Sequence, residues 1–403
     1  MVRRKLVLGA AFAAATALTL SACGQSSGNK AQARLDPIKV AAILTTQSAG
    51  FGYPEMADAI KARAAAINAT GGIQGRTIEV TVCNDGVDPT TAGQCARDAV
   101  AAGAVAVVGG ITVEGDAITN ALRPAGVAYI TPTPLSRGDF TSPISFAIGG
   151  GSPVIYAGLG VTLVRDYTCR KIDTITSSGP GAQQTVGFVR AGIASAGSQL
   201  NGDHSISDVA IDFSTVVASV AGDGADCVAL ILPAEQAARA IPALRLGAPG
   251  IRIGAALASV TPDMLRVLQS QADNIALVDA YYPVTSDRPA LKQFTAEMAR
   301  YTPASVPDPL ALQSWGAMNL LGKVLENIGA APITRASILA ELAHTGPIDS
   351  GVTDPELSFQ TPNPSKDYPR VFNTRYLDII TRNSQYALVK PGFSDVAPVL
   401  KGL

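Results

Sequence analysis

The stretch CNDGVDPTTAGQC, residues 83–95, places two cysteines around acid and amide side chains. Such a set could bind a metal, exchange electrons or form a disulfide. An EF-hand calcium loop needs glycine at its sixth position, and Gly86 comes too early in this run. Zinc-binding cysteines usually lie about two to four residues apart, and redox pairs usually have the form CxxC. The spacing therefore favours a structural disulfide.

Residue types that support enzymatic chemistry are scarce. The chain has two histidines, His204 and His344, and neither has a second histidine at metal-ligand spacing, so we expect both at the surface. No GxSxG elbow and no Walker loop occurs. The run GGGS, residues 149–152, is glycine-rich enough to cradle a phosphate, but glycine content alone does not make a phosphate site. We expect a protein that is not an enzyme and needs no metal or cofactor.

The N-terminus has the features of an export signal. Three cations at residues 3–5 precede an apolar run that is too short to span a bilayer comfortably. This run ends at LSAC, which resembles the lipobox of bacterial lipoproteins, in which the cysteine is diacylated and becomes the first mature residue. We expect a signal peptide over residues 1–22, a lipid anchor on Cys23 and a flexible tether over residues 23–36.

Charge and cysteine count agree with an exported protein. Removal of the signal peptide takes away three cations and no acid, which changes the formal net charge from −1 to −4. A weakly acidic chain with scattered charges lacks the basic patch that binds nucleic acid. In an oxidising compartment, the four cysteines that remain suggest two disulfides, for which three pairings are possible. We predict that sequence neighbours pair, Cys83 with Cys95 and Cys169 with Cys227.

The elements that would position a site alternate between short apolar runs and longer helical patterns. The run IKVAAIL (38–44) predicts a strand buried on both faces. It precedes a helix over about 53–68 with an apolar stripe. A glycine-rich break at 145–153 separates this series from a second one, in which VAI (209–211) is a predicted strand. Repeated βα units predict a doubly wound parallel sheet, and two series predict two α/β lobes.

The segment INATGGIQGRTIEVTVCNDGVDP, residues 67–89, resembles the first lobe of type I periplasmic binding proteins. The resemblance extends over about residues 38–345 and is greatest to branched-chain amino acid receptors of ATP-binding-cassette (ABC) importers. It implies a clamshell whose three hinge segments lie near 149–152, 279–284 and 345–350. A small solute would bind between the lobes, and closure would report it to a permease and ATPase complex.

The hinge segments divide the chain into discontinuous lobes. We expect an N-lobe of residues 37–150 plus 281–345 and a C-lobe of residues 151–280 plus 346–403.

The resemblance also implies which loops hold the ligand. In the loop after the first strand, Phe51 or Tyr53 would close over it, although Tyr53 could instead pack at a helix start. Thr112 would offer a hydroxyl, whereas Glu114 favours a cation or simply caps a helix. Tyr281 could face the cleft or pack in the hinge. The full set of candidate ligand-binding residues is Ser48, Phe51, Tyr53, Thr112, Glu114, Thr133, Gln183 and Tyr281.

The ligand is expected to differ from a standard branched-chain amino acid. The loop GAALAS (254–259) contains no acid, although amino acid receptors use one there to pair with the ammonium group. A buried ammonium without a carboxylate partner is costly. A sensing or scaffolding lipoprotein that uses the same clamshell without transport is the alternative function.

Overall fold

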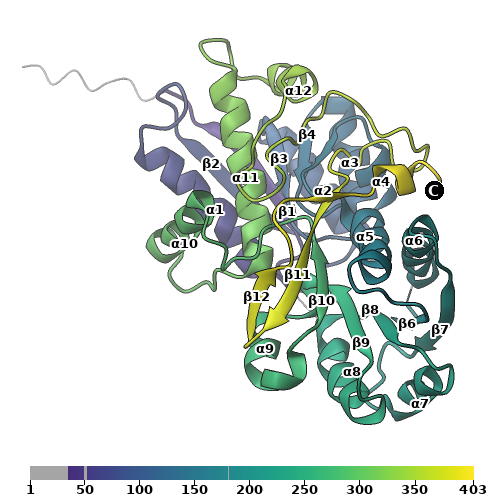
Figure 1. Cartoon of the computed structure of the whole chain (residues 1–403). Coiled ribbons are helices and arrows are strands. Elements are labelled where there is room, and N and C mark those ends of the chain that lie inside the picture. Colours follow the sequence, from purple (N-terminus) through teal and green to yellow (C-terminus); the bar gives the residue numbers. More distant parts are fainter. Residues whose placement is uncertain (1–34, 50–51, 180) are drawn as a thin grey trace, which may run out of the picture. The chain divides into compact units, whose positions relative to one another are not determined.

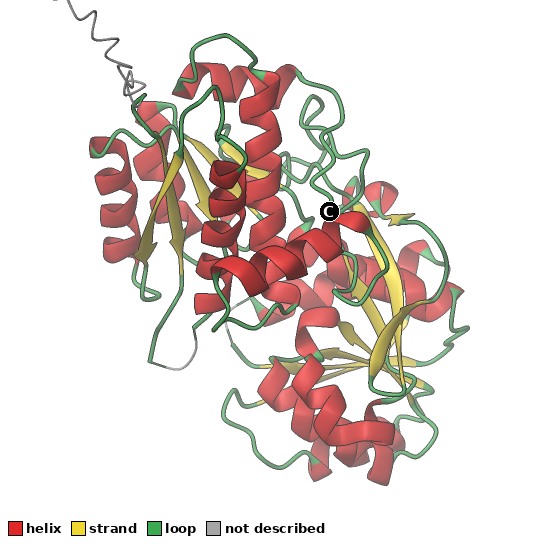
Figure 2. Ribbon diagram, turned by 90° about the vertical axis from the view of Figure 1, so that its left-hand side faces the viewer, coloured by secondary structure: helices red, strands yellow, loops and turns green. Residues whose placement is uncertain are grey.

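A computed structural model describes residues 35–49, 52–179 and 181–403 (Figure 1). Residues 36–403 form one compact unit that contains two α/β lobes, each built on its own sheet. Figure 2 shows helices on both faces of the strands. The predicted two-lobed α/β fold is confirmed. Cys23, the signal peptide and most of the tether lie outside the described residues.

The first sheet is parallel, with the strand order β2-β1-β3-β4-β5. Its inner strand β1 is almost wholly apolar because helices cover both of its faces. The sheet consists of β1 (Ile38–Leu44), β2 (Ile78–Asn84), β3 (Ala106–Gly109), β4 (Ala128–Thr131) and β5 (Ser145–Ala147).

Alternate residues of β1 serve two separate cores. Val40 and Leu44 pack in one core with the α1 and α11 side chains, while Ala41 and Ile43 pack in another with α2 and α3. The predicted apolar stripe of α1, which includes Met56 and Ile60, is buried. The helices of this lobe are α1 (Pro54–Ala69), α2 (Pro89–Ala101), α3 (Gly115–Leu122), α4 (Arg137–Thr141), α10 (Pro289–Tyr301), α11 (Pro309–Asn327) and α12 (Arg335–His344).

The second sheet has the order β12-β11-β10-β9-β8-β6-β7, and β13 pairs with β11. Strands β6 to β10 are parallel, whereas β11 and β12 form an antiparallel hairpin at one edge. These strands are β6 (Ile172–Ser177), β7 (Leu200–Ile206), β8 (Cys227–Ile231), β9 (Arg252–Ala256), β10 (Ala276–Asp279), β11 (Arg375–Arg382), β12 (Gln385–Leu388) and β13 (Ser394–Asp395).

Helices cover both faces of this sheet as well. Side chains of α5 and α6 form one core with it, and those of α7, α8 and α9 pack on the opposite face. The helices are α5 (Gly151–Arg165), α6 (Ala182–Ser195), α7 (Ser214–Gly222), α8 (Ala234–Gly247), α9 (Pro262–Leu268) and α13 (Ala397–Leu400). None of the helices within the described ranges is long and apolar enough to cross a membrane.

The strand predicted at residues 209–211 is wrong. Val209 and Ile211 are exposed to 84% and 77% and lie in a loop. The strand is β7, a few residues earlier, and its residues alternate between half-buried and exposed. Because β7 is the edge strand, it is mostly polar and lacks the apolar run that marks the inner strands.

Three segments connect the two lobes, as predicted: residues 148–150, 280–288 and 345–374. Hydrogen bonds tie these segments to one another. The Asn373 side chain donates to the Ile148 carbonyl oxygen over 2.9 Å, and the Tyr282 N–H donates to the Val352 carbonyl oxygen over 3.0 Å. The third segment is much longer than the predicted residues 345–350, and it is irregular.

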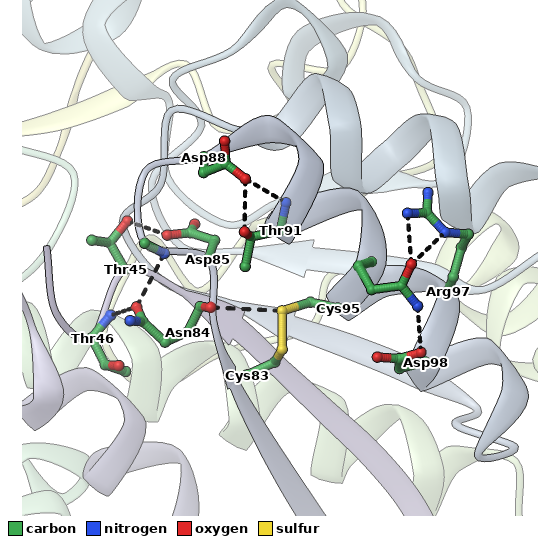
Figure 3. The surroundings of a disulfide bond; sticks show 12 residues. Thr45, Thr46, Cys83, Asn84, Asp85, Asp88, Thr91, Cys95, Arg97 and Asp98 are labelled. Carbon is green, nitrogen blue, oxygen red and sulfur yellow. Dashed lines mark hydrogen bonds between the residues drawn. A yellow bond between two sulfur atoms is a disulfide. The ribbon is translucent and has the colours of Figure 1, made fainter.

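Both disulfides pair as predicted, Cys83 with Cys95 and Cys169 with Cys227. The first joins the end of β2 to the second turn of α2 (Figure 3). Asp88 caps that helix, since its carboxylate accepts a hydrogen bond from the Thr91 N–H over 2.7 Å. The stretch 83–95 is therefore a structural clip.

Candidate functional site

A cavity of about 150 Å³ lies where the connecting segments meet the carboxyl ends of the strands. Open α/β sheets bind ligands at this edge. Both lobes and the connections supply its wall: Pro132, Thr133, Leu135, Gly149, Gly150, Gly151, Ser152, Ile155, Tyr156, Ala256, Leu257, Ala258, Val278, Asp279, Ala280, Tyr281 and Gln313. We call this the hinge cavity.

The glycine run at one side of the hinge cavity is required by close packing. A Cβ atom on Gly149 would lie 2.6 Å from the Pro132 carbonyl oxygen, and one on Gly151 would lie 2.4 Å from the Pro134 carbonyl oxygen. Gly151 also has a φ of +64°, which favours glycine. These glycines form a connection between lobes, and their role is to allow the backbones to approach.

Hydrogen bonds over long sequence distances fix the polar part of the wall. The Tyr281 hydroxyl donates to the Pro132 carbonyl oxygen over 2.5 Å, and the Thr133 hydroxyl donates to the Gln313 side-chain oxygen over 2.6 Å. These bonds join the second connection and α11 to the turn after β4. Thr133 and Tyr281 are the predicted ligand residues that line the hinge cavity.

Asp279, the last residue of β10, is the only ionisable carboxyl group among the residues that line the hinge cavity. It is 6% exposed, and its Oδ1 accepts a hydrogen bond from the Tyr281 N–H over 3.3 Å. Burial raises the pKa of this carboxyl to about 7, against the lowering effect of the Tyr281 and Ala280 backbone N–H groups. No Lys, Arg or His lies in the described wall to neutralise it.

The remaining wall is largely apolar. Ile155 and Tyr156 come from the first turns of α5, and Leu257 and Ala258 follow β9. Burial raises the pKa of the Tyr156 phenol to about 12, so the group is neutral and can only exchange hydrogen bonds. The cavity thus combines an apolar surface with one buried carboxyl group.

The loop after β1 does not contribute to the hinge cavity in the described residues. Tyr53 occupies the residue before α1 and packs against the core, which is the packing role considered for it above. Asn84 accepts hydrogen bonds from the Thr46 and Gln47 N–H groups and holds the start of this loop against β2. Ser48 is half-buried, and Phe51 lies outside the described residues.

Thr112 and Glu114 form a local turn at the start of α3. The buried Thr112 hydroxyl accepts a hydrogen bond from the Glu114 N–H over 2.9 Å. Glu114 stands at the cap position, but its side chain makes no cap hydrogen bond, so the capping role predicted for it is wrong. Burial, followed by the charges of Asp85, Asp88 and Asp116, raises its pKa.

Gln183 is exposed in the first turn of α6 and is absent from the wall of the hinge cavity. Its neighbour Gln184 donates a hydrogen bond to the Tyr368 hydroxyl over 2.9 Å.

A second, larger cavity of about 620 Å³ also has walls from both lobes. Its described lining contains four carboxyl groups and no cation: Glu55, Asp58, Asp263 and Asp308. Burial, followed by the Asp308 and Asp58 charges, raises the pKa of Glu55 to about 7. We call this the acidic cavity.

His204 is not the plain surface residue that the sequence predicted. Its Nε2 lies 3.0 Å from an Asp173 oxygen and 3.1 Å from an Asp223 oxygen. The imidazole ring therefore lies between two carboxylates. His344 is exposed at the end of α12, as predicted, and its Nδ1 lies 2.8 Å from the Ala340 carbonyl oxygen.

The predicted ligand set lacked most contributors to the hinge cavity, among them Tyr156, Leu257, Asp279 and Gln313. Asp279 carried a readable signal, because it ends the buried run ALVD just before the second connection. A carboxyl group at the end of a buried parallel strand lies at the ligand edge of the sheet. Gln313 had no such signal, since it lies inside a nearly wholly buried helix.

Comparisons with known proteins agree with this architecture. A family model described as periplasmic binding protein matches residues 37–365. A fatty acid ABC transporter substrate-binding protein from Thermomonospora curvata is similar in structure, with a TM-score of 0.73 and 16% identity over 91% of this chain and 94% of that one. No curated protein matches the sequence.

Two further solved structures illustrate the range of similar proteins. The branched-chain amino acid transporter substrate-binding protein LivJ from Streptococcus pneumoniae, in complex with isoleucine, has a TM-score of 0.70 and 17% identity over 89% of this chain and 99% of that one. A solute-binding protein from R. palustris, in complex with benzoate, has a TM-score of 0.68 and 18% identity over 89% and 96%.

Proposed function

Because the chain belongs to the periplasmic binding protein family, we propose that it captures a small solute between its two lobes and delivers it to an ABC importer. The family is one of binding proteins and not of enzymes. The observation that carries the proposal is the hinge cavity, whose wall combines the turn after β4 in one lobe with the end of β9 in the other.

Binding at this position couples occupancy to lobe closure. A solute in the hinge cavity contacts Thr133 in the first lobe and Leu257 in the second at the same time. It therefore binds the closed arrangement more tightly than an open one and shifts the population toward closure. A permease complex that recognises the closed form would then receive loaded protein.

The proposal includes a lipid anchor at Cys23 on the outer face of the cell membrane, behind a signal peptide of residues 1–22. It also keeps the predicted lobes, 37–150 plus 281–345 and 151–280 plus 346–403. The helices from α10 to α12 pack with the first sheet, which supports this division. A Cys23→Ala variant grown in cells should leave the membrane fraction.

The ligand is proposed to differ from leucine and valine. The Thr112 hydroxyl, the expected partner of an amino acid carboxylate, is absent from the wall of the hinge cavity and accepts a hydrogen bond from the Glu114 N–H. The Glu114 carboxyl adds negative charge beside it, which disfavours an anion. Micromolar binding of leucine, measured by calorimetry, would contradict this part of the proposal.

A thermal-shift screen of amines, amides, ureas, organic acids and amino acids tests the function. A ligand at about 100 times its Kd adds about 2.7 kcal/mol to the free energy of unfolding. The response should disappear in Ala258→Phe, because this exposed residue lines the hinge cavity. Ala101→Phe, at an exposed position at the end of α2, is the control.

Absence of any shift across the panel would count against a solute receptor. A shift that Ala258→Phe leaves unchanged would place the binding site elsewhere.

A further inference from the structure

We propose that the hinge cavity binds a small organic ammonium ion, with the cationic nitrogen on the Asp279 carboxylate and the apolar body against Ile155, Tyr156 and Leu257. This inference rests on the proposed function and names the class of solute that the same site takes.

The first argument is the state of Asp279. Its side chain is 6% exposed and lines the hinge cavity, and its hydrogen-bond donors are backbone N–H groups. A buried carboxylate is normally paired with a cation. Without one in the described wall, burial raises its pKa to about 7. A cationic ligand is the partner that this group lacks.

The second argument is the arrangement of the polar groups around it. The Tyr281 and Thr133 hydroxyls are donors that could serve an anion, but both already donate to protein oxygens. The described wall contains no Lys, Arg or His. A ligand carboxylate would therefore lie near Asp279 with no charged partner, whereas an ammonium group gains one.

The third argument is the negative electrostatic field of the acidic cavity. Its four carboxyl groups come from α1, α9 and the segment that leads into α11, so both lobes contribute. Lys61 pairs with Asp58, and Arg266 pairs with Asp263. The side chains of these two cations are 49% and 75% exposed. Solvent screens such exposed pairs strongly.

The acidic cavity and Asp279 belong to one region of the molecule. The charges of Asp279 and Asp308 both raise the pKa of the Tyr386 phenol, after the larger effect of burial. One phenol is therefore within electrostatic reach of both carboxyl groups. The negative field of the acidic cavity favours the approach of cations and disfavours that of anions.

The fourth argument is size and shape. A volume of about 150 Å³ is that of a cavity which holds a molecule such as benzene. The apolar wall and the single carboxyl group therefore suit a primary amine with a compact hydrocarbon body.

Matched probes test the charge requirement. Calorimetry on the purified chain would compare benzylamine, benzyl alcohol and benzoate, and then 3-methylbutylamine, 3-methylbutanol and 4-methylpentanoate. Within at least one set we expect the amine to bind about 10-fold or more tightly than the alcohol, which is the range for a hydrogen bond to a charged group. The carboxylate should not bind detectably.

Asp279→Asn is the decisive variant, because it keeps the shape of the side chain and removes its charge. We expect amine affinity to fall about 10- to 100-fold, toward that of the matched alcohol. Asp287→Asn is the matched control, since Asp287 lies in the connection that follows Asp279, is 86% exposed and pairs with Lys292. Thermal unfolding of both variants would show that they are folded.

The possible outcomes separate the two proposals. Failure of every amine to bind, or amine affinity unchanged in Asp279→Asn, overturns the ammonium assignment. If alcohols or carboxylates bind as tightly as amines and Ala258→Phe abolishes that binding, the ligand class is wrong while the receptor function stands. If no solute of any class binds, the receptor function fails as well.

Discussion

Two buried aspartates, Asp139 after β4 and Asp279 at the end of β10, show how similar burial can serve different purposes. They are 1% and 6% exposed. Asp139 belongs to the capping box of α4, where its Oδ2 accepts hydrogen bonds from the Leu135 and Ser136 N–H groups. Asp279 caps no helix and lines the hinge cavity.

Burial raises the pKa of both carboxyl groups, to about 6 for Asp139 and to about 7 for Asp279. For Asp139, the main opposing effects come from the N–H and hydroxyl groups of Ser136 and the N–H of Leu135. For Asp279, only two backbone N–H groups oppose burial. Both carboxyl groups are therefore held at a cost, but Asp139 serves the capping box of α4, whereas Asp279 faces a cavity in which a ligand can offset the cost.

The largest expected effect is on the pH dependence of stability in Asp279→Asn. The folded-state pKa of about 7 lies above the unfolded value of 3.8, so the wild type loses stability as pH rises from about 4 to 7. The shift sets an upper bound of about 4 kcal/mol on the gain of the variant at pH 8. Urea unfolding at pH 4 and pH 8 measures it, and a gain that is equal at both pH values would contradict the assignment.

Asp139→Asn should gain less. The rise of its pKa from 3.8 to about 6 bounds the gain at pH 8 to about 3 kcal/mol. Unlike Asp279→Asn, this variant should leave amine affinity unchanged, which the same calorimetry would measure. A loss of amine affinity equal to that of Asp279→Asn would contradict the claim that only Asp279 binds the ligand.

Amine affinity should itself depend on pH. A cation pairs with the ionised form of Asp279, so benzylamine should bind about tenfold less tightly per unit of pH below about 7. The phenols of Tyr281 and Tyr386 face this carboxyl group, and both stay neutral because burial raises their pKa. An alkylammonium stays charged in this range, as lysine does.

Glu55 in the acidic cavity also has a pKa of about 7, so its titration could produce a similar pH dependence of amine affinity. The pH dependence should be lost in Asp279→Asn and kept in Glu55→Gln. Calorimetric titrations of both variants at pH 6, 7 and 8 measure this. A pH dependence that is lost in Glu55→Gln and kept in Asp279→Asn would assign the effect to the acidic cavity.

The smallest effect is expected from Ser136→Ala, which removes the hydroxyl that caps α4 and hydrogen-bonds to the Asp139 N–H over 3.2 Å. Loss of a cap costs about 1 kcal/mol of stability. Denaturant unfolding measures it, and amine affinity should not change. A larger effect on affinity than on stability would mean that this turn contacts the ligand directly.

Local sequence signals were sufficient for much of the fold. The apolar run of β1, the Asp88 cap and the alternation of strands with helices reflect short-range chemistry, and the structure confirms them. Strand β7 was misplaced, because an edge strand with a polar face lacks such a signal. The length of the third connection could not be predicted from local sequence either, since it depends on how the two lobes pack.

The site was harder to predict for a physical reason. Residue type suggested that Thr112 would bind ligand, but Thr112 is buried and does not line the hinge cavity. The wall of the hinge cavity depends on contacts across long sequence distances, such as the bond between Thr133 and Gln313. Of the candidate residues, Thr133 and Tyr281 line the hinge cavity, whereas Asp279 became visible only when its burial and its missing cation were known.

The three glycines at residues 149–151 have a consequence for how binding affinity can change without any change in ligand contacts. Atoms of the neighbouring backbone leave no room for a methyl group at these positions. A side chain at Gly151 would push the start of α5 away from the turn after β4, and both of these segments line the hinge cavity. Under the proposed function, a replacement that disfavours lobe closure lowers the apparent affinity in proportion to the fraction of closed molecules. Replacements along the glycine run would then give receptors with graded sensitivity to the same solute.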